Sequence, residues 1–129
     1  MKAKELMIGD WVYSKSDNKN HKVNSIISQK DGSVLVAIEE DVSSDYMFEP
    51  IPLKRIHLTK NGFNATNAED TEFVYRDGYE IKVMIEEDLA DAIFLSIEFA
   101  ERNIWKEIKY VHELQQAMRL MGCEQEIRL

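Results

Sequence analysis

Short apolar runs separated by polar turns dominate the first fifty residues. Residues 11–13, Trp-Val-Tyr, follow a Gly-Asp turn and combine aromatic with β-branched side chains, which favours a strand. The polar residues 14–20 predict a loop. Two further apolar runs, residues 21–29 and 33–38, are separated by Asp31-Gly32, a pair typical of the type I′ turn of a β-hairpin.

A last short strand is predicted at residues 46–48, before two prolines. Pro50 and Pro52 lack the backbone N–H that a ladder needs, so they end regular pairing. Several short strands within about fifty residues are typical of a small, strongly bent sheet. We therefore predict an SH3-like partial barrel over residues 1–52.

The pattern changes to helical spacing after Pro52 and then returns to alternation. Residues 53–60 predict a short helix that ends at Asn61-Gly62. Residues 73–76 and 79–85, joined by Asp77-Gly78, predict a second hairpin whose second strand alternates apolar with polar positions. Residues 92–99 fit either a strand or a helix, and their Ile and aromatic content favours the strand.

The clearest helix is predicted over residues 110–121. Its apolar stripe recurs at steps of three and four, and Gly122 follows as a C-cap. Polar side chains including His112 and Gln115 are predicted outward or at the edge of the stripe. Residues 126–129 alternate again and predict a final edge strand.

These elements predict a single α+β domain over residues 1–129. It comprises the SH3-like β subregion 1–52, the short helix 53–62, and an antiparallel sheet with one C-terminal amphipathic helix over residues 69–129.

The net charge of −8 is concentrated in one part of the chain. Residues 1–61 carry nine basic and nine acidic groups and are neutral, whereas residues 69–101 carry eleven carboxylates against Arg76 and Lys82. We call these carboxylates the acidic band. An acidic surface repels phosphate backbones, so direct nucleic-acid binding is not expected.

Signatures of catalysis and of metal binding are absent from the sequence. The five glycines are isolated, the three histidines lie far apart, and Cys123 is the single cysteine. A lone thiol fits a reducing compartment, and no apolar run is long enough to span a bilayer. We therefore expect a cytoplasmic protein without a cofactor or a bound metal.

Two groups of residues are candidate partner contacts. Trp11 and Tyr13, with Tyr46 and Phe48, could line the aromatic groove that an SH3-like sheet offers to peptides, although core packing is the simpler explanation for each aromatic taken singly. The second group is the acidic turn of the acidic band, which consists of Glu86, Glu87, Asp88 and Asp91. It lacks the spacing and the glycine of a calcium loop, so we interpret it as a solvated turn that could meet a basic partner.

Three segments resemble a known family. Residues 3–13, residues 48–53 with residues 60–63, and the motif Lys-Tyr-Val-His-x-Leu-Gln at residues 109–115 are similar to small uncharacterised proteins of Bacteroides-type gut bacteria, often associated with prophages and other mobile elements. The resemblance covers nearly the whole chain, and residues 116–124 depart from the family pattern. It implies a mobile-element context and transfers no catalytic residue.

Within this motif, packing explains His112 and Gln115 least. They lie three residues apart on one helical face. We expect them to bond neighbouring backbone and fix the helix, and a partner contact is the alternative.

Three functions remain open on the sequence alone. The first is a non-enzymatic protein-binding or accessory module of a mobile element, whose protein partner is basic. The second is an acidic nucleic-acid mimic that inhibits a basic host protein. The third is a small enzyme whose site is assembled from distant residues. The absence of catalytic motifs favours the first.

Overall fold

The computed structural model describes residues 1–39, 41–76, 80–99, 102–123 and 125–129. The predicted Asp77-Gly78 turn lies outside these ranges. Antiparallel sheets and a C-terminal helix make up the fold, which confirms the α+β class. The chain divides into two compact units, residues 1–51 and residues 52–129, and their boundary falls one residue from the predicted end of the first subregion. That both units form one domain stays a prediction.

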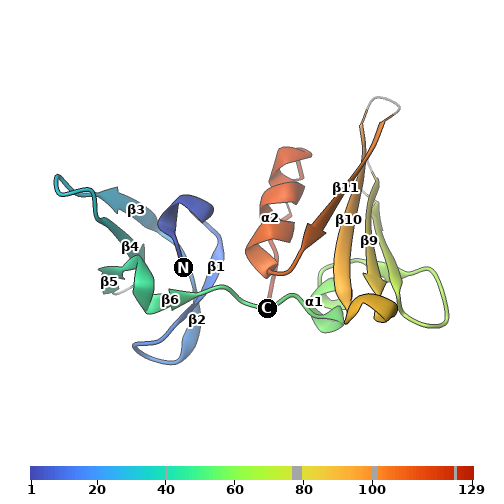
Figure 1. Cartoon of the computed structure of the whole chain (residues 1–129), viewed down its shortest axis with the longest axis horizontal. Helices are drawn as coiled ribbons and strands as arrows, with labels where there is room; N and C mark the ends of the chain where they lie inside the picture. The colour runs from blue at the N-terminus through green and yellow to red at the C-terminus, as the bar shows by residue number, and fades with distance from the viewer. Residues whose placement is uncertain (40, 77–79, 100–101, 124) are drawn as a thin grey trace. The chain divides into compact units, whose positions relative to one another are not determined.

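The first unit contains six short strands (Figure 1). The strands are β1 (Trp11–Ser14), β2 (Lys19–Lys22), β3 (Ser25–Ser28), β4 (Val34–Ile38), β5 (Asp41–Ser44) and β6 (Phe48–Glu49), with 3₁₀ turns η1 (Ala3–Glu5) and η2 (Asp45–Met47). They pair as two three-stranded antiparallel sheets in the orders β2-β1-β6 and β3-β4-β5. The SH3-like arrangement of these strands stays a prediction.

The core of the first unit lies between its strands and η1. Val12 and Val36 are fully buried, and β1 alternates buried with half-buried positions as its sequence predicts. The buried members of this core are Ala3, Leu6, Val12, Val23, Val36, Ile38 and Phe48. These side chains come from both sheets and from η1, so the core joins the two sheets.

The predicted strand over residues 21–29 is wrong in one respect, because the chain changes sheets in its middle. The Val23 backbone exchanges hydrogen bonds with the Gly9-Asp10 turn, at 2.7 Å and 2.8 Å, whereas the next residue, Asn24, donates to Ala37 of β4 at 2.8 Å. Residues 19–22 also belong to a strand, so the predicted loop at residues 14–20 is too long. The strand predicted over residues 21–29 is thus divided between β2 and β3.

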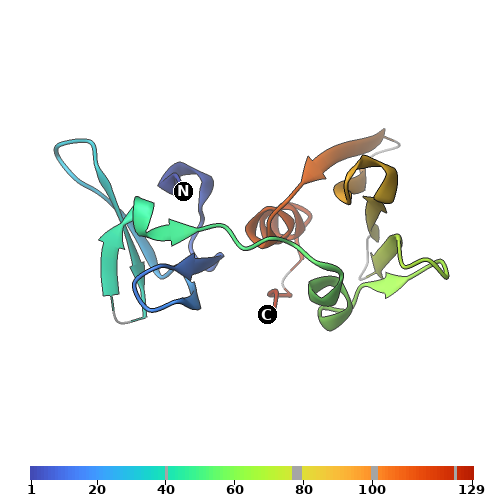
Figure 2. The same ribbon diagram turned by 60° about the horizontal axis from the view of Figure 1, so that its bottom comes forward.

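The hairpin at Asp31-Gly32 is confirmed, and its predicted turn type is wrong. Gly32 has a φ of +87°, but Asp31 does not have the positive φ that a type I′ turn requires. Gly32 N–H donates to Gln29 O, and Gln29 N–H donates to Ser33 O. This is a three-residue loop that ends in a left-handed glycine. The loop projects at the end of the β3–β4 ribbon (Figure 2).

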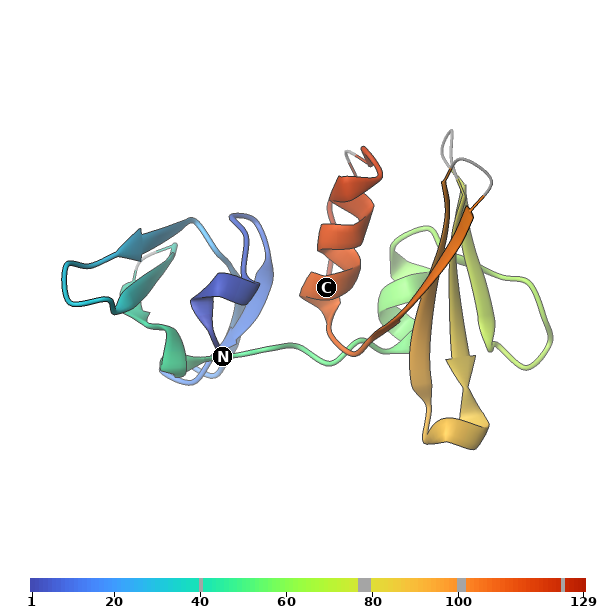
Figure 3. The same cartoon turned by 45° about the horizontal axis from the view of Figure 1, so that its top comes forward.

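The second unit is built on a five-stranded antiparallel sheet in the order β11-β10-β9-β8-β7. The strands are β7 (Asn64–Ala65), β8 (Glu72–Arg76), β9 (Glu80–Glu86), β10 (Ala92–Phe99) and β11 (Arg102–Ile108), with the 3₁₀ turn η3 (Glu87–Leu89) between β9 and β10. Figure 3 shows η3 at the tip of the β9–β10 ribbon. The strands predicted at residues 73–76, 79–85 and 92–99 are confirmed over their described residues.

One face of this sheet is buried, and we call the other its outer face. Ile81, Val83 and Ile85 of β9 are buried, and Ile93 and Leu95 lie opposite them on β10. Alternate residues, beginning with Glu80, Lys82 and Met84, point to the outer face. The core of this unit therefore lies on the side of the isoleucines and valines.

Two helices belong to the second unit. Helix α1 (Arg55–Lys60) ends at Asn61-Gly62, where Gly62 has a φ of +85° as a left-handed stop requires. Helix α2 (Val111–Leu120) buries Val111, Leu114 and Met118, which confirms the predicted stripe, and Gly122 follows it with a φ of +82°. No helix in the described ranges is long and apolar enough to cross a bilayer.

The predicted edge strand at residues 126–129 is wrong. The segment is irregular, and Asn61 binds it through its side chain: Asn61 Oδ1 accepts from Arg128 N–H at 2.6 Å, and Asn61 Nδ2 donates to Arg128 O at 2.8 Å. The two hydrogen bonds of the buried Asn61 side chain, rather than pairing with another strand, thus hold this segment at Arg128. Ile127 is still buried, which explains the alternation in the sequence.

We expect the second unit to lose stability at mildly acidic pH through His57. His57 Nδ1 accepts a hydrogen bond from Lys54 N–H at 3.0 Å, at the start of α1. Burial, and then repulsion by Lys54 and Lys60, lower the pKa of His57. The unfolded chain therefore takes up the proton first, near the ordinary histidine pKa of about 6.5. The stabilisation is present above this value and is lost as the pH falls through the lower pKa of the folded state.

The energy of one hydrogen bond, about 1 kcal/mol, is an upper limit for this loss, and solvent screening reduces it because His57 is partly exposed. It is measured as the free energy of unfolding in urea at pH 8 and pH 5. The control is His57→Asn, which keeps a polar side chain and does not titrate. Equal pH dependence in the two proteins would show that another group is responsible.

Candidate functional site

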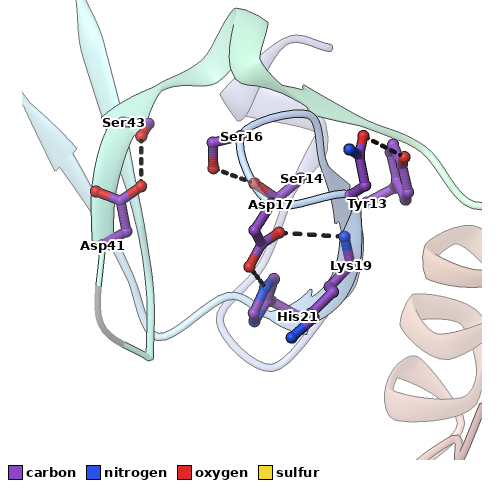
Figure 4. Close-up of polar contacts among 9 residues, drawn as sticks. Tyr13, Ser14, Ser16, Asp17, Lys19, His21, Asp41 and Ser43 are labelled. Atoms are coloured by element: carbon purple, nitrogen blue, oxygen red, sulfur yellow. Dashed lines mark hydrogen bonds and ion pairs between the residues drawn. The ribbon is translucent and has the colours of Figure 1, made fainter.

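A polar cluster closes the loop between β1 and β2 (Figure 4). Asp17 Oδ2 lies 2.6 Å from His21 Nε2, and Asp17 Oδ1 accepts from Lys19 N–H at 3.1 Å. The hydrogen bond with the His21 side chain is the main cause that lowers the pKa of Asp17. An Asp–His pair is part of a catalytic triad only if a nucleophile meets the other ring nitrogen.

The nearby serines do not supply that arrangement. Ser14 Oγ and Ser16 Oγ lie 2.8 Å apart and bond each other (Figure 4). Ser14 is buried, whereas Asp17 is exposed to solvent. The bonds of the cluster fix the conformation of the loop, and we assign the cluster a structural role.

The four aromatic residues predicted as a groove are placed differently from one another. Trp11 and Tyr13 share the side of β1 opposite the core, where Lys22 Nζ lies 5.4 Å from the Trp11 ring centroid and Tyr13 OH donates to Asn18 at 2.8 Å. Phe48 is 1% exposed and belongs to the core, whereas Tyr46 is 66% exposed. The groove of four aromatics is therefore not formed, and Trp11 with Tyr13 stays a candidate contact.

His112 and Gln115 are buried on α2, with exposed fractions of 4% and 2%. The prediction that they face outward or lie at the edge of the stripe is wrong. The ring of His112 stacks on Tyr110, with centroids 5.8 Å apart. Burial of this kind favours the hypothesis that they fix the helix over the hypothesis of a partner contact.

The acidic band is partly neutralised by basic side chains. Among the described residues, three ion pairs involve its members: Glu72 with Lys82 at 3.9 Å, Glu80 with Arg76 at 3.2 Å, and Glu87 with Arg55 at 3.4 Å. Asp77 and Glu101 lie outside the described residues. The band is therefore not a uniform negative surface over the strands.

The outer face of the second sheet carries a shallow hollow beside η3. It measures about 380 Å³. We call it the outer-face hollow, and it is lined by Met84, Glu86, Leu89, Phe94 and Trp105. Three strands and η3 supply these residues, and Phe94 lies directly opposite Met84 in the ladder. Leu89 and Trp105 are 60% and 49% exposed, so the walls of the hollow are apolar side chains in contact with water.

Carboxylates border this hollow. Glu86 is part of its lining, and Asp88 precedes Leu89 in η3. Glu107 lies opposite Phe94 on β11, is exposed, and points to the outer face. The outer-face hollow thus combines apolar walls with the carboxylate residue Glu86 in its lining and with Glu107 beside Phe94.

Asp91 lines a different hollow from Glu86. It lines a second hollow of about 350 Å³ beside α1, together with buried Ile85 and Ile93 and with Lys54 and Arg55. Two residues of the predicted acidic turn, Glu86 and Asp91, therefore line different hollows. Of these residues, Glu86 is the one that lines the outer-face hollow.

The apolar members of the outer-face hollow are not among the contact residues predicted from the sequence. Met84 stands at an outer-face position of β9, between the polar residues Lys82 and Glu86. Phe94 stands between two buried residues of β10, so that strand is apolar on both faces. Apolar residues at solvent-facing positions of an amphipathic strand were the available signal.

Comparison of the chain with protein-family models, curated proteins and solved structures gives no match. Within the described ranges, no group of three or more His, Cys, Asp or Glu side chains is arranged to hold a metal ion.

Proposed function

We propose that the protein is a non-enzymatic binding module that holds a basic segment of a partner protein at the outer-face hollow. The observation that carries this proposal is the exposure of Leu89 and Trp105 around a hollow with carboxylates at its border. Contiguous exposed apolar side chains rimmed by polar groups are typical of protein-interaction sites. The carboxylates favour lysine or arginine beside the apolar anchor of the partner.

The alternative of a nucleic-acid mimic has less support. A mimic needs a continuous array of unpaired negative charge, and three of the carboxylates of the acidic band lie within 4 Å of a basic side chain. The mobile-element context rests on the resemblance of the motif at residues 109–115. We also propose a cytoplasmic location, because Cys123 is a free, buried thiol.

The proposal predicts salt-sensitive binding of a basic, partly apolar peptide. The probe is a synthetic ten-residue peptide in which lysine, threonine, leucine and threonine repeat in this order. Binding is followed by the fluorescence of Trp105 in a Trp11→Phe variant, which leaves one tryptophan. Leu89→Gln is expected to weaken binding about fivefold or more, since it removes an exposed apolar wall of the hollow. Raising the salt from 50 mM to 500 mM is expected to weaken it further.

The matched control is Leu120→Gln, because Leu120 is 87% exposed and lies on α2. It is expected to bind the probe as the parent protein does. A second control peptide has glutamate in place of each lysine and is expected not to bind. Equal affinity for both peptides, or equal effects of the two leucine variants, would refute the proposed function.

A further inference from the structure

Among the described residues, the strand at one end of the second sheet pairs with a neighbouring strand on one side only, and it lies next to the outer-face hollow. β11 is the last strand in the order β11-β10-β9-β8-β7 and spans seven residues, whereas β7 at the opposite end spans two. In an antiparallel ladder, alternate residues turn their N–H and C=O groups away from the neighbouring strand. Part of the β11 backbone is therefore directed to the edge, where another extended chain can pair with it.

The exposure of the β11 side chains agrees with an open edge. Trp105 is 49% exposed, and Lys106 and Glu107 are also exposed. Just beyond the strand, the chain already accepts an extended segment: Leu53 N–H donates to Lys109 O at 2.9 Å, and Pro52 forms an antiparallel bridge with Tyr110. This segment then turns into α1 at Arg55 and does not continue as a sixth strand.

Charged residues on an edge strand also serve to discourage pairing with other chains. Lys106 and Glu107 fit that simpler role. Trp105 does not, because an exposed indole on an edge promotes association rather than preventing it. Its place in the wall of the outer-face hollow gives it a binding role instead.

From these observations we infer that the partner segment binds as an added β-strand along β11. The inference rests on the proposed function and specifies how the partner is held. Backbone hydrogen bonds to β11 supply the pairing, and side chains of the added strand that point to the outer face supply specificity. A basic side chain next to Glu107 and an apolar side chain next to Trp105 complement this face. The partner is therefore an extended segment whose basic and apolar residues alternate on one face.

The experiment uses the Lys-Thr-Leu-Thr peptide and two backbone-methylated forms of it. In one form the odd-numbered amides carry N-methyl groups, and in the other the even-numbered amides do. An added strand directs one of these two sets of N–H groups to β11 and the other to solvent. One methylated peptide is expected to bind at least tenfold more weakly, while the other keeps most of the affinity.

Amide hydrogen exchange of the full chain gives a second measurement. The unmethylated peptide is expected to slow exchange at alternate residues of β11, and the opposite edge strand β7 is the internal control. Equal binding of both methylated peptides, with unchanged exchange in β11, would overturn strand addition and leave the binding module standing. A peptide that does not bind at all would overturn both.

Discussion

Phe48→Ala is expected to unfold most of the first unit. Phe48 is 1% exposed and packs in the core that joins both sheets of this unit. Removing a buried phenylalanine side chain costs about 3–5 kcal/mol, because both the transfer free energy and the packing around the cavity are lost. A unit of about fifty residues has a total stability of similar size. The expected result is loss of hydrogen-exchange protection at the amides of Val36 and Ile38.

Tyr46→Ala is the matched control for this variant. Tyr46 lies two residues earlier in the same segment and is 66% exposed. Surface substitutions of this kind usually change stability by less than about 0.5 kcal/mol. If both variants lost protection to the same degree, the core position of Phe48 would be incorrect, and a role in an aromatic surface would return.

Asn61→Ala is expected to destabilise the second unit by about 2–4 kcal/mol. The Asn61 side chain is buried and makes three hydrogen bonds, to His57 O at 2.6 Å and to both backbone groups of Arg128 at 2.6 Å and 2.8 Å. Its own carbonyl accepts from Gln125 Nε2 at 3.0 Å. Alanine would leave the backbone partners, which are partly buried, without their hydrogen-bond donor or acceptor, and this costs more than the bonds themselves contribute. Urea unfolding followed by far-UV circular dichroism measures the loss.

Asn67→Ala supplies the control for hydrogen bonding by an asparagine. Asn67 also makes three side-chain bonds, one to Thr71 Oγ1 at 2.7 Å and two from backbone N–H groups, and these are exposed. Water replaces such bonds at little cost, so a loss of about 0.5–1 kcal/mol is expected. Equal losses for the two asparagines would mean that the Asn61 bonds to Arg128 contribute no more to the free energy of unfolding than exposed hydrogen bonds do.

Elements with a regular apolar pattern could be predicted from the sequence. The period-two run of β9 and the stripe Val111, Leu114 and Met118 of α2 each have one buried side, and both elements lie close to their predicted bounds. Gly62 and Gly122 could be predicted as stops because helix ends require a left-handed residue there.

Two strands carry too weak a signal to be predicted. β5 contains one large apolar residue, Val42, which is 51% exposed, so its position is set by pairing with β4 rather than by burial. In β11, exposed Lys106 lies on the same face of the strand as buried Ile108, so the period-two pattern is broken. Both segments form strands because they pair with a neighbouring strand, and such pairing cannot be predicted from a local sequence pattern.

The candidate site was predicted in part. Of the predicted contact residues, Glu86 lines the outer-face hollow and Asp91 lines another hollow. Trp105 comes to the hollow through the β10–β11 pairing, in which it lies opposite Ser96. Register across three strands brings these side chains together, and it follows from the hairpin turns rather than from any single segment.

The sheet order also determines when each unit is able to form during synthesis. β7 to β11 pair in the order in which they leave the ribosome, so each new strand finds its neighbour already made. The first unit is different, because β1 pairs with β6, more than thirty residues further along the chain. Until Phe48 and Glu49 emerge, the nascent chain holds Val12 and Val36 without the side chain that completes their core. The first unit therefore completes its core only after its last strand, β6, has been synthesised.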